Sequence, residues 1–331
     1  MTSTSKKPVL VTGGAGYIGS HCCKLLARHG YLPVVYDNLS TGNRKAVKWG
    51  PLIVDDVSDH AALATALRDH APMAVLHFAA SAYVGESVAD PAKYYQNNIG
   101  CMITLLDCCR EAKVGRIVFS SSCATYGVPD ILPITELTPQ RPINPYGRTK
   151  LICEGMLQDY SLAYGLRYVA LRYFNAAGAD PEAELGEWHS PETHLIPRAM
   201  LAAAAKAGPL EVFGNDYPTL DGTCVRDYIH VTDLATAHVA ALRHLLEVGH
   251  DLSVNLGTGT GYSILEVLTT IKRITGREVP TSFKPRRPGD PPVLVANAKK
   301  AKFSLGFAPK LSDLDTIIST ASPFFGLGGA P

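Results

Sequence analysis

The chain has 331 residues, a formal net charge of +1 and charged residues at 18% of its positions. No basic block stands out in this balanced composition, so we expect neither nucleic acid nor an anionic membrane surface as a partner. No apolar run reaches the ~18 residues that a membrane-spanning helix needs. The polar start, Met1–Pro8, meets a strand pattern at once, so we expect no signal peptide.

Strand and helix patterns alternate through the first half of the chain. The expected strands are 9–11, 33–36, 52–54, 74–78, 116–119 and 168–171, and the expected helices are 18–29, 61–70, 92–112 and 145–164. This alternation predicts an α/β fold with a Rossmann-type doubly wound parallel sheet.

The pattern changes after Asn175, where Pro and Gly become frequent. Separate helices are expected at 193–207, 232–247 and 263–275. We therefore expect a dinucleotide-binding Rossmann domain at 1–175, with 231–256 returning to it, and a smaller C-terminal α/β substrate domain made mainly of 176–331.

Eight cysteines indicate the compartment. Two adjacent pairs, Cys22-Cys23 and Cys108-Cys109, lie in expected helices, where neighbouring side chains point apart. Reduced core thiols in a cytoplasmic protein fit this arrangement best. No C-x-x-C pair and no matching histidine cluster is evident, so the sequence predicts no metal site.

Three glycines, Gly13, Gly16 and Gly19, lie between the first strand and the first turn of the first helix. Glycines there let the backbone turn tightly and approach a phosphate, while the helix N-terminus offers free N–H groups and a partial positive charge. The G-x-x-G-x-x-G spacing is the form found in short-chain dehydrogenases/reductases and predicts a bound dinucleotide. A tight turn without a ligand is the alternative interpretation.

Asp37 ends the second strand, 18 residues beyond Gly19. A carboxylate there can accept hydrogen bonds from the adenosine ribose and repels a 2′-phosphate, which favours NAD over NADP. An ordinary turn aspartate would also fit. Further cofactor contacts are expected after the third and fourth strands, at Asp56, Val57, Phe78, Ala79 and Ala80.

Tyr146 and Lys150 share one face of an expected helix, and Ser122 closely follows the fifth strand, at the sheet edge where α/β proteins bind ligands. Such a set can take a proton from a sugar alcohol if the phenol pKa of ~10 falls by ~3 units, or about 4 kcal/mol. A lysine ammonium ~5 Å away supplies about 3 kcal/mol, and the positive nicotinamide ring would supply the rest. The alternative interpretation is that Tyr146 and Lys150 form an ordinary i,i+4 pair on a helix surface.

Several stretches together resemble the UDP-glucose 4-epimerase (UDP-galactose 4-epimerase) family of extended short-chain dehydrogenases/reductases. The resemblance runs over roughly residues 9–311 and is carried by VTGGAGYIGSH, YDNLSTGN, HFAASAYVGESV, YYQNN, FSSSCATYG, NPYGRTK, LRYFNAAGA, FGNDYPTLDGTCVRDYIHVTDLA and PRRPGD.

The resemblance implies a tightly bound NAD and a UDP-sugar substrate held by the second domain. It implies catalysis by Ser122, Tyr146 and Lys150. The further cofactor contacts that it implies are Tyr17, Ile18, Asn38, Asn97 and Phe174, with Tyr146 and Lys150. The implied substrate contacts are Ser122, Tyr146, Asn175, Leu195, Phe213, Arg226, Arg287, Asp290 and Leu294.

The implied reaction interconverts UDP-galactose and UDP-glucose through a transient 4-keto sugar. Tyr146 would take the 4-hydroxyl proton while C4 gives hydride to the nicotinamide; the keto sugar turns, and hydride returns to its other face. A UDP-pentose (xylose/arabinose) or UDP-N-acetylhexosamine 4-epimerase is the nearest alternative. A sugar-nucleotide dehydratase is less favoured because Cys123-Ala124 stands where such relatives carry acids, and a non-catalytic NAD-binding sensor because Tyr146 and Lys150 are both present.

Three positions depart from the family pattern. Ser81-Ala82 stands where several members carry Leu-Lys, and His194-Leu195 replaces an Asn-Leu pair at the substrate. Leu294 matches a gate beside the sugar ring that is Tyr or Cys in relatives, which leaves tolerance of an N-acetyl group open.

A homodimer is expected because segments 92–112 and 145–164 resemble the helices that pair across the family's dimer axis. Apolar side chains cover more of 98–109 than a single sheet-facing stripe requires. A second buried face would explain the excess.

Overall fold

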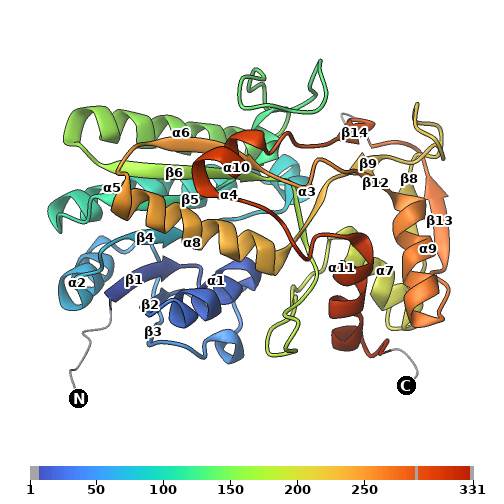
Figure 1. Ribbon diagram of the computed structural model, residues 1–331, viewed down its shortest axis with the longest axis horizontal. Coiled ribbons are helices and arrows are strands. Elements are labelled where there is room, and N and C mark those ends of the chain that lie inside the picture. Colours follow the sequence, from blue (N-terminus) through green and yellow to red (C-terminus); the bar gives the residue numbers. More distant parts are fainter. Residues whose placement is uncertain (1–6, 288–289, 329–331) are drawn as a thin grey trace.

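The strands of the first half assemble into one parallel sheet in the computed structural model, which describes residues 7–287 and 290–328. Pro288 and Gly289 of the PRRPGD stretch lie outside the described residues, as do positions 1–6 and 329–331. Helices cover both faces of this sheet, and a smaller group of helices and short strands lies at one end of the molecule (Figure 1).

The sheet has seven strands in the order β11-β6-β5-β4-β1-β2-β3, and every pair is parallel. Its strands are β1 (Lys7–Thr12), β2 (Tyr31–Tyr36), β3 (Leu52–Ile53), β4 (Val75–His77), β5 (Arg116–Ser122), β6 (Arg167–Tyr173) and β11 (Leu252–Leu256). The order reverses between β1 and β4, and ligands bind doubly wound sheets at the carboxyl ends of the strands on either side of such a reversal. The predicted fold class is confirmed.

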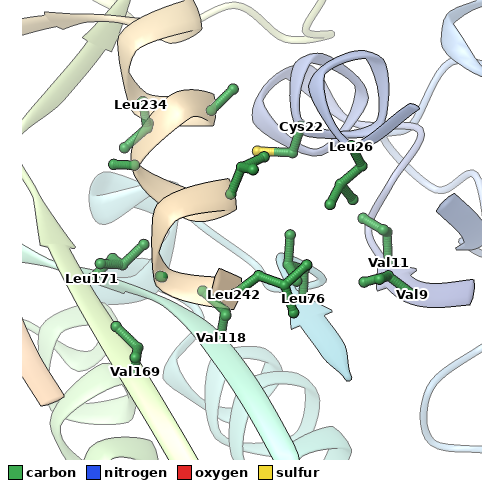
Figure 2. Close-up of a cluster of buried hydrophobic side chains, with 14 of the residues drawn as sticks. Val9, Val11, Cys22, Leu26, Leu76, Val118, Val169, Leu171, Leu234 and Leu242 are labelled. Carbon is green, nitrogen blue, oxygen red and sulfur yellow. The ribbon is translucent and has the colours of Figure 1, made fainter. Parts of the chain in front are cut away.

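Alternating side chains of each strand enter two separate hydrophobic cores. Val9 and Val11 face one core, where they pack with α1 (Tyr17–Arg28) and α8 (Val231–Glu247), as Figure 2 shows. Leu10 faces the other core. The helices of that second face are α2 (His60–His70), α5 (Cys101–Glu111) and α6 (Pro145–Tyr164). Burial on both faces requires the nearly continuous apolar strands seen in the sequence.

The expected helix 92–112 is not uniform. It consists of α4 (Pro91–Tyr94), a π-helical turn (Tyr95–Gly100) and α5, and a short helix, α3 (Val84–Ala89), precedes it. Within the turn, the Asn98 amide oxygen accepts from Ser81 N at 2.8 Å, and its Nδ2 donates to Thr149 Oγ1 at 3.0 Å. These bonds tie the turn to the cavity edge described below, and π-turns are frequent at functional sites.

The strands at the smaller end of the molecule are too short to show an alternation of apolar and polar residues in the sequence. They pair as β7 (Asn175–Ala177) with β10 (Tyr228–His230), β8 (Leu210–Phe213) with β13 (Thr281–Lys284), and β12 (Tyr262–Ser263) with β9 (Val225–Arg226) and β14 (Val293–Leu294). Its helices are α7 (Leu195–Ala203), α9 (Ile264–Thr275) and α11 (Leu314–Ala321), around a third core. α10 (Lys299–Leu305) and short 3₁₀ turns at Arg44–Ala46, Cys123–Thr125 and Ser322–Phe325 complete the fold.

The chain crosses back to the large sheet after β10. α8 packs against α1, and β11 pairs with β6 from Leu252↔Val169 to Leu256↔Tyr173. Among the residues that the structure describes, no helix is both long and apolar enough to cross a membrane.

Candidate active site

A cavity of about 750 Å³ lies at the carboxyl ends of β1, β2, β4, β5 and β6, with β9 and β14 on its far wall. Most of the residues singled out in the sequence line it. They are Gly13, Gly16, Tyr17, Ile18, Gly19, Asp37, Asn38, Asp56, Val57, Phe78, Ala79, Ala80, Asn97, Ser122, Tyr146, Lys150, Phe174, Asn175, Arg226, Asp290 and Leu294. Segments from both halves of the chain therefore form one site.

The glycine turn leaves no room for side chains. Gly13 has φ +71°, and a Cβ there would lie 2.6 Å from Ala79 N; a Cβ on Gly19 would lie 2.2 Å from Gly13 O. α1 begins just beyond Gly16, which has no side-chain cap, and its first turn carries no acidic residue. The first N–H groups of α1 therefore have no capping partner within the helix, and they suit a dinucleotide pyrophosphate.

Asp37 is held rigidly at the end of β2. Its Oδ2 accepts from Ala15 N at 2.9 Å and its Oδ1 from Leu39 N at 2.8 Å. Burial raises the pKa of this carboxyl above its usual value, although the two backbone hydrogen bonds oppose the shift. Each oxygen keeps a second lone pair, so the site can also accept from ribose hydroxyls.

Tyr146 and Lys150 are both buried on α6, with exposed fractions of 8% and 4%. Lys150 Nζ lies 5.8 Å from the centre of the Tyr146 ring and donates to Ser120 O at 2.8 Å. Burial raises the pKa of Tyr146 to about 12, against a smaller lowering by the Ser122 side chain. Burial also lowers the pKa of Lys150 to about 8.

These directions differ from the lowered phenol pKa expected from the sequence. That expectation counted the attraction of a nearby ammonium but not the cost of removing both groups from water. Without a positive nicotinamide ring beside it, the Tyr146 phenol stays protonated at neutral pH.

The end of β5 divides its serines between two environments. Ser120 and Ser122 line the cavity, whereas Ser121 donates to Glu154 Oε1. The alternation follows from the period of two in a β-strand. One strand end therefore serves the cavity on one side and a buried polar network on the other.

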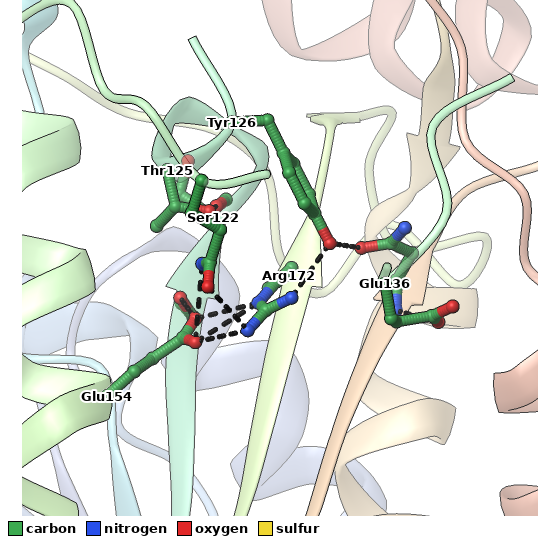
Figure 3. A network of polar contacts seen from close by, with 9 residues as sticks. Ser122, Thr125, Tyr126, Glu136, Glu154 and Arg172 are labelled. Carbon is green, nitrogen blue, oxygen red and sulfur yellow. Dashed lines mark hydrogen bonds and ion pairs between the residues drawn. The ribbon is translucent and has the colours of Figure 1, made fainter. Parts of the chain in front are cut away.

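The buried network centres on Arg172 and Glu154 (Figure 3). The Arg172 guanidinium also donates to the Tyr126 hydroxyl at 2.8 Å, which donates in turn to Asn255 Oδ1 at 2.7 Å. The Glu136 carboxylate accepts from Asn255 N at 2.8 Å. Together these bonds fix the long connection from β5 to α6. The sequence interpretation missed them, although an arginine inside the apolar run of β6 was a signal.

A second buried carboxylate supports the far wall of the cavity. Asp227 is 0% exposed and accepts from Thr258 N at 2.9 Å, Gly259 N at 3.1 Å and Ala296 N at 3.1 Å. It lies beside Arg226, which is paired in register with Leu294. The sequence interpretation did not single out Asp227.

Three expected substrate contacts lie outside the cavity lining. Leu195 begins α7 and packs on the third core. The Arg287 guanidinium lies 3.9 Å from the centre of the Phe213 ring, so these two side chains stack on each other rather than on the cavity. The site residues at Leu195, Phe213 and Arg287 therefore remain predictions.

The sequence interpretation considered histidines only as partners of cysteine pairs and did not single out a group of histidines with glutamates. His189 and His194 lie together at the cavity wall, with ring centres 5.0 Å apart, beside Glu187 and Glu192. A search for cysteine spacings missed them; the pattern E-x-H-x-x-E-x-H was the signal.

The fold and the cavity define a Rossmann-type dinucleotide-binding protein. Residues 9–257 match the model of the NAD dependent epimerase/dehydratase family, and the chain belongs to that family.

The similarity to known proteins extends over nearly the whole chain. It is 55% identical over 313 residues to UDP-glucose 4-epimerase of Rhizobium meliloti, covering 95% of each protein. The structure of UDP-glucose 4-epimerase from Brucella ovis in complex with NAD is 63% identical with a TM-score of 0.95, over 97% of this chain and 98% of that one. A UDP-glucose 4-epimerase from Stenotrophomonas maltophila, with bound NAD and formylated UDP-arabinopyranose, is 40% identical with a TM-score of 0.93, over 97% and 98%. The resemblance noted in the sequence is confirmed.

Proposed function

We propose that this chain interconverts UDP-galactose and UDP-glucose by NAD-dependent 4-epimerisation through a transient 4-keto sugar. The observation that carries the proposal is one cavity that joins Tyr146 and Lys150 to an uncapped glycine turn and, on the opposite wall, to Arg226. The similar epimerases at 55% and 63% identity support it.

The cofactor would lie along the ends of β1, β2 and β4. Gly13, Gly16 and Gly19 would hold its pyrophosphate and Asp37 its adenosine ribose. When bound, NAD supplies the acceptor for hydride from C4 of the sugar. The glycine turn would hold the pyrophosphate with backbone N–H groups at the start of α1, and we expect the cofactor to stay tightly bound for this reason.

Tyr146 would act as the general base for the 4-hydroxyl proton, and Ser122 would orient the same hydroxyl. The Lys150 ammonium, 5.8 Å from the phenol ring, would favour the phenolate once a second positive charge enters the cavity.

Arg226 would hold the diphosphate from the far wall. Its Nη1 donates to Pro291 O at 2.9 Å, which fixes the guanidinium at the cavity edge near Asp290. A firm grip on UDP with looser contacts to the sugar would let the keto sugar turn between its two faces.

The test is incubation of purified protein with UDP-galactose and no added cofactor. We expect UDP-glucose to form. Absolute dependence on added NADP, or steady net release of NADH, would contradict the proposal.

A UDP-pentose substrate is the second candidate. The Stenotrophomonas maltophila structure holds formylated UDP-arabinopyranose, which favours this alternative. Parallel assays with UDP-xylose and UDP-N-acetylgalactosamine separate the candidates, since the preferred substrate gives the highest kcat/KM.

We also propose a homodimer paired through α5 and α6. Most of the apolar side chains on α5 are buried within the chain itself, so the excess expected from the sequence largely fills the second core. Ile103 on α5 and Ile152 on α6 remain 47% and 41% exposed, and they support pairing there. Light scattering should give about twice the 35.4 kDa chain mass; a particle of single-chain mass at micromolar concentration would contradict the dimer.

A cytoplasmic location fits the cysteines. All eight are free thiols, and only Cys123 is more than marginally exposed. We propose the reducing cytoplasm on this ground.

A further inference from the structure

Four side chains from the loop before α7 converge at the wall of the cavity. Glu187, His189, Glu192 and His194 each present one ligand atom, and these four atoms lie within 4.8 Å of one another. Both carboxylates are nearly buried, with side-chain exposures of 5% and 9%. Members of the cluster line both the main cavity and a second hollow of about 580 Å³, so an ion could reach it from either.

One of the four contacts in the cluster, between His194 Nδ1 and Glu192 Oε1, is a hydrogen bond, and the other three are longer. His194 Nδ1 lies 3.2 Å from Glu187 Oε1 and 2.9 Å from Glu192 Oε1. His189 Nδ1 lies 3.2 Å from Glu187 Oε1 and 3.5 Å from Glu192 Oε2. Each imidazole nitrogen therefore faces both carboxylates, although a single N–H can be directed at only one.

His189 Nδ1 is buried and has no hydrogen-bond partner among the described residues. An orphaned polar atom of this kind is rare in a folded protein and calls for a ligand or ion. A tetrahedral cation with ligands at about 2.05 Å separates neighbouring ligand atoms by about 3.3 Å. The four nitrogen–oxygen separations, from 2.9 to 3.5 Å, bracket that value; Glu192 enters through Oε1 in one of them and through Oε2 in another.

A nearby acidic cluster provides the contrast. Asp180, Glu182 and Glu184 surround Lys24 Nζ at 2.6, 3.1 and 2.6 Å, so an ammonium already occupies the place of a cation. In the described part of the chain, Glu187 and Glu192 have no lysine or arginine within ion-pair distance. Glu192 Oε1 also accepts from the backbone N–H groups of Thr193 and His194, each at 2.8 Å. The other partners of the two carboxylates in the described residues are the imidazoles, which are themselves metal ligands.

We propose that Glu187, His189, Glu192 and His194 form a site for one divalent transition-metal cation of the zinc class. A set of two nitrogen and two carboxylate ligands is typical of zinc rather than of calcium or magnesium, which prefer oxygen alone. With all four positions taken by protein, the ion is structural.

The site would join three parts of the cavity wall. The His189 ring lies 6.1 Å from the ring of Tyr17, at the glycine turn, and 6.2 Å from the ring of Tyr83, after β4. A bound ion would hold the loop 187–194 against both. The proposal does not depend on the reaction, because the same ligands would bind a cation whatever the substrate.

The test is calorimetric titration of tag-free full-length protein with Zn²⁺ after chelator treatment and desalting. The titration is run at pH 8. Burial lowers the pKa values of the two histidines, but the neighbouring carboxylates raise that of His189 to about 9 and that of His194 to about 10, so binding of the ion should also release protons. We expect saturable binding of one equivalent. Replacement by Co²⁺ should give the intense visible absorption of a tetrahedral complex.

Variants localise the site. His189→Asn and Glu187→Gln should each weaken Zn²⁺ binding by at least about 100-fold, the upper end of what even outer-shell changes cost. His250→Asn, which alters an exposed histidine far along the chain, is the matched control and should bind as the wild type does. Circular dichroism confirms that each variant is folded.

Absence of saturable binding, or equal binding by the wild type and both ligand variants, would overturn the proposal. If the variants do not fold, anomalous diffraction from a wild-type crystal soaked in Zn²⁺ decides the matter. A peak among the four ligand atoms supports the site, and a peak only elsewhere overturns it.

Discussion

Two sets of polar groups near the end of strand β5 are buried to a similar degree but are satisfied very differently. The rigid set is Arg172 of β6 with Glu154 of α6, which have side-chain exposures of 8% and 7% and are surrounded by partners. The reactive set is Tyr146 and Lys150 of α6, which are 8% and 4% exposed. Their charged forms are disfavoured by burial, and they face an open cavity.

The difference shows how one strand end can provide both rigidity and reactivity. A buried charge with every partner in place keeps its protonation state. Burial lowers the pKa of Arg172, but the hydrogen bonds and the charge of Glu154 raise it above its usual value. A buried group without a charged partner stays close to the point where a ligand can change its protonation state. The rigid set fixes the geometry within which the reactive set acts.

The largest expected effect tests the rigid set. Arg172→Met should lower the free energy of unfolding by about 3–5 kcal/mol, because it leaves the Glu154 carboxylate buried without its partner. Chemical denaturation measures the loss. The double variant Arg172→Met with Glu154→Leu is the control and should recover most of the stability, since no uncompensated charge remains. A double variant no more stable than the single one would show that packing, not charge, is responsible.

The next effect tests the reactive set. Tyr146→Phe should reduce turnover of UDP-galactose on the order of 10²-fold or more, as expected for a lost general acid–base group. Its free energy of unfolding should stay within about 1 kcal/mol of the wild type, and NAD should still bind. Near-wild-type turnover would show that another group takes the proton.

The third prediction concerns the range of substrates and the far wall of the cavity, which Leu294 lines. Leu294→Tyr should lower any activity on UDP-N-acetylglucosamine at least about tenfold while sparing UDP-glucose, because overpacking a tight site costs about 1–3 kcal/mol. Leu294→Cys should act in the opposite direction. Ratios of kcat/KM measure both. Parallel losses on the two substrates would mean that Leu294 acts on folding or cofactor retention instead.

The smallest effect concerns the pH dependence of stability. In nucleotide-free protein the pKa of Lys150 is about 8, whereas its ordinary value is 10.5. Between these values the unfolded chain binds more protons than the folded one, so stability rises with pH as the folded lysine loses its charge. The wild type should gain about 1 kcal/mol over Lys150→Met between pH 8 and 9. Denaturation curves at both pH values measure the gain, and equal changes would contradict the lowered pKa.

Local features of the sequence determined much of this protein. The three-residue spacing of Gly13, Gly16 and Gly19 and the four-residue spacing of Tyr146 and Lys150 each act within one turn or one helix, so they were legible without the fold. The alternation of apolar strands with helices likewise predicted the parallel sheet, because each strand is buried on both faces.

Tertiary structure alone decided which distant polar groups meet. Arg172 and Asn255 bond to Tyr126, and Asp227 caps backbone near Thr258 and Ala296, across separations that no sequence period encodes. Strands of two or three residues, such as β9 and β14, are too short to show alternation. The direction in which the pKa of Tyr146 shifts also came only from the fold. Burial depends on neighbours from every part of the chain, whereas the spacing between Tyr146 and Lys150 depends on one helix.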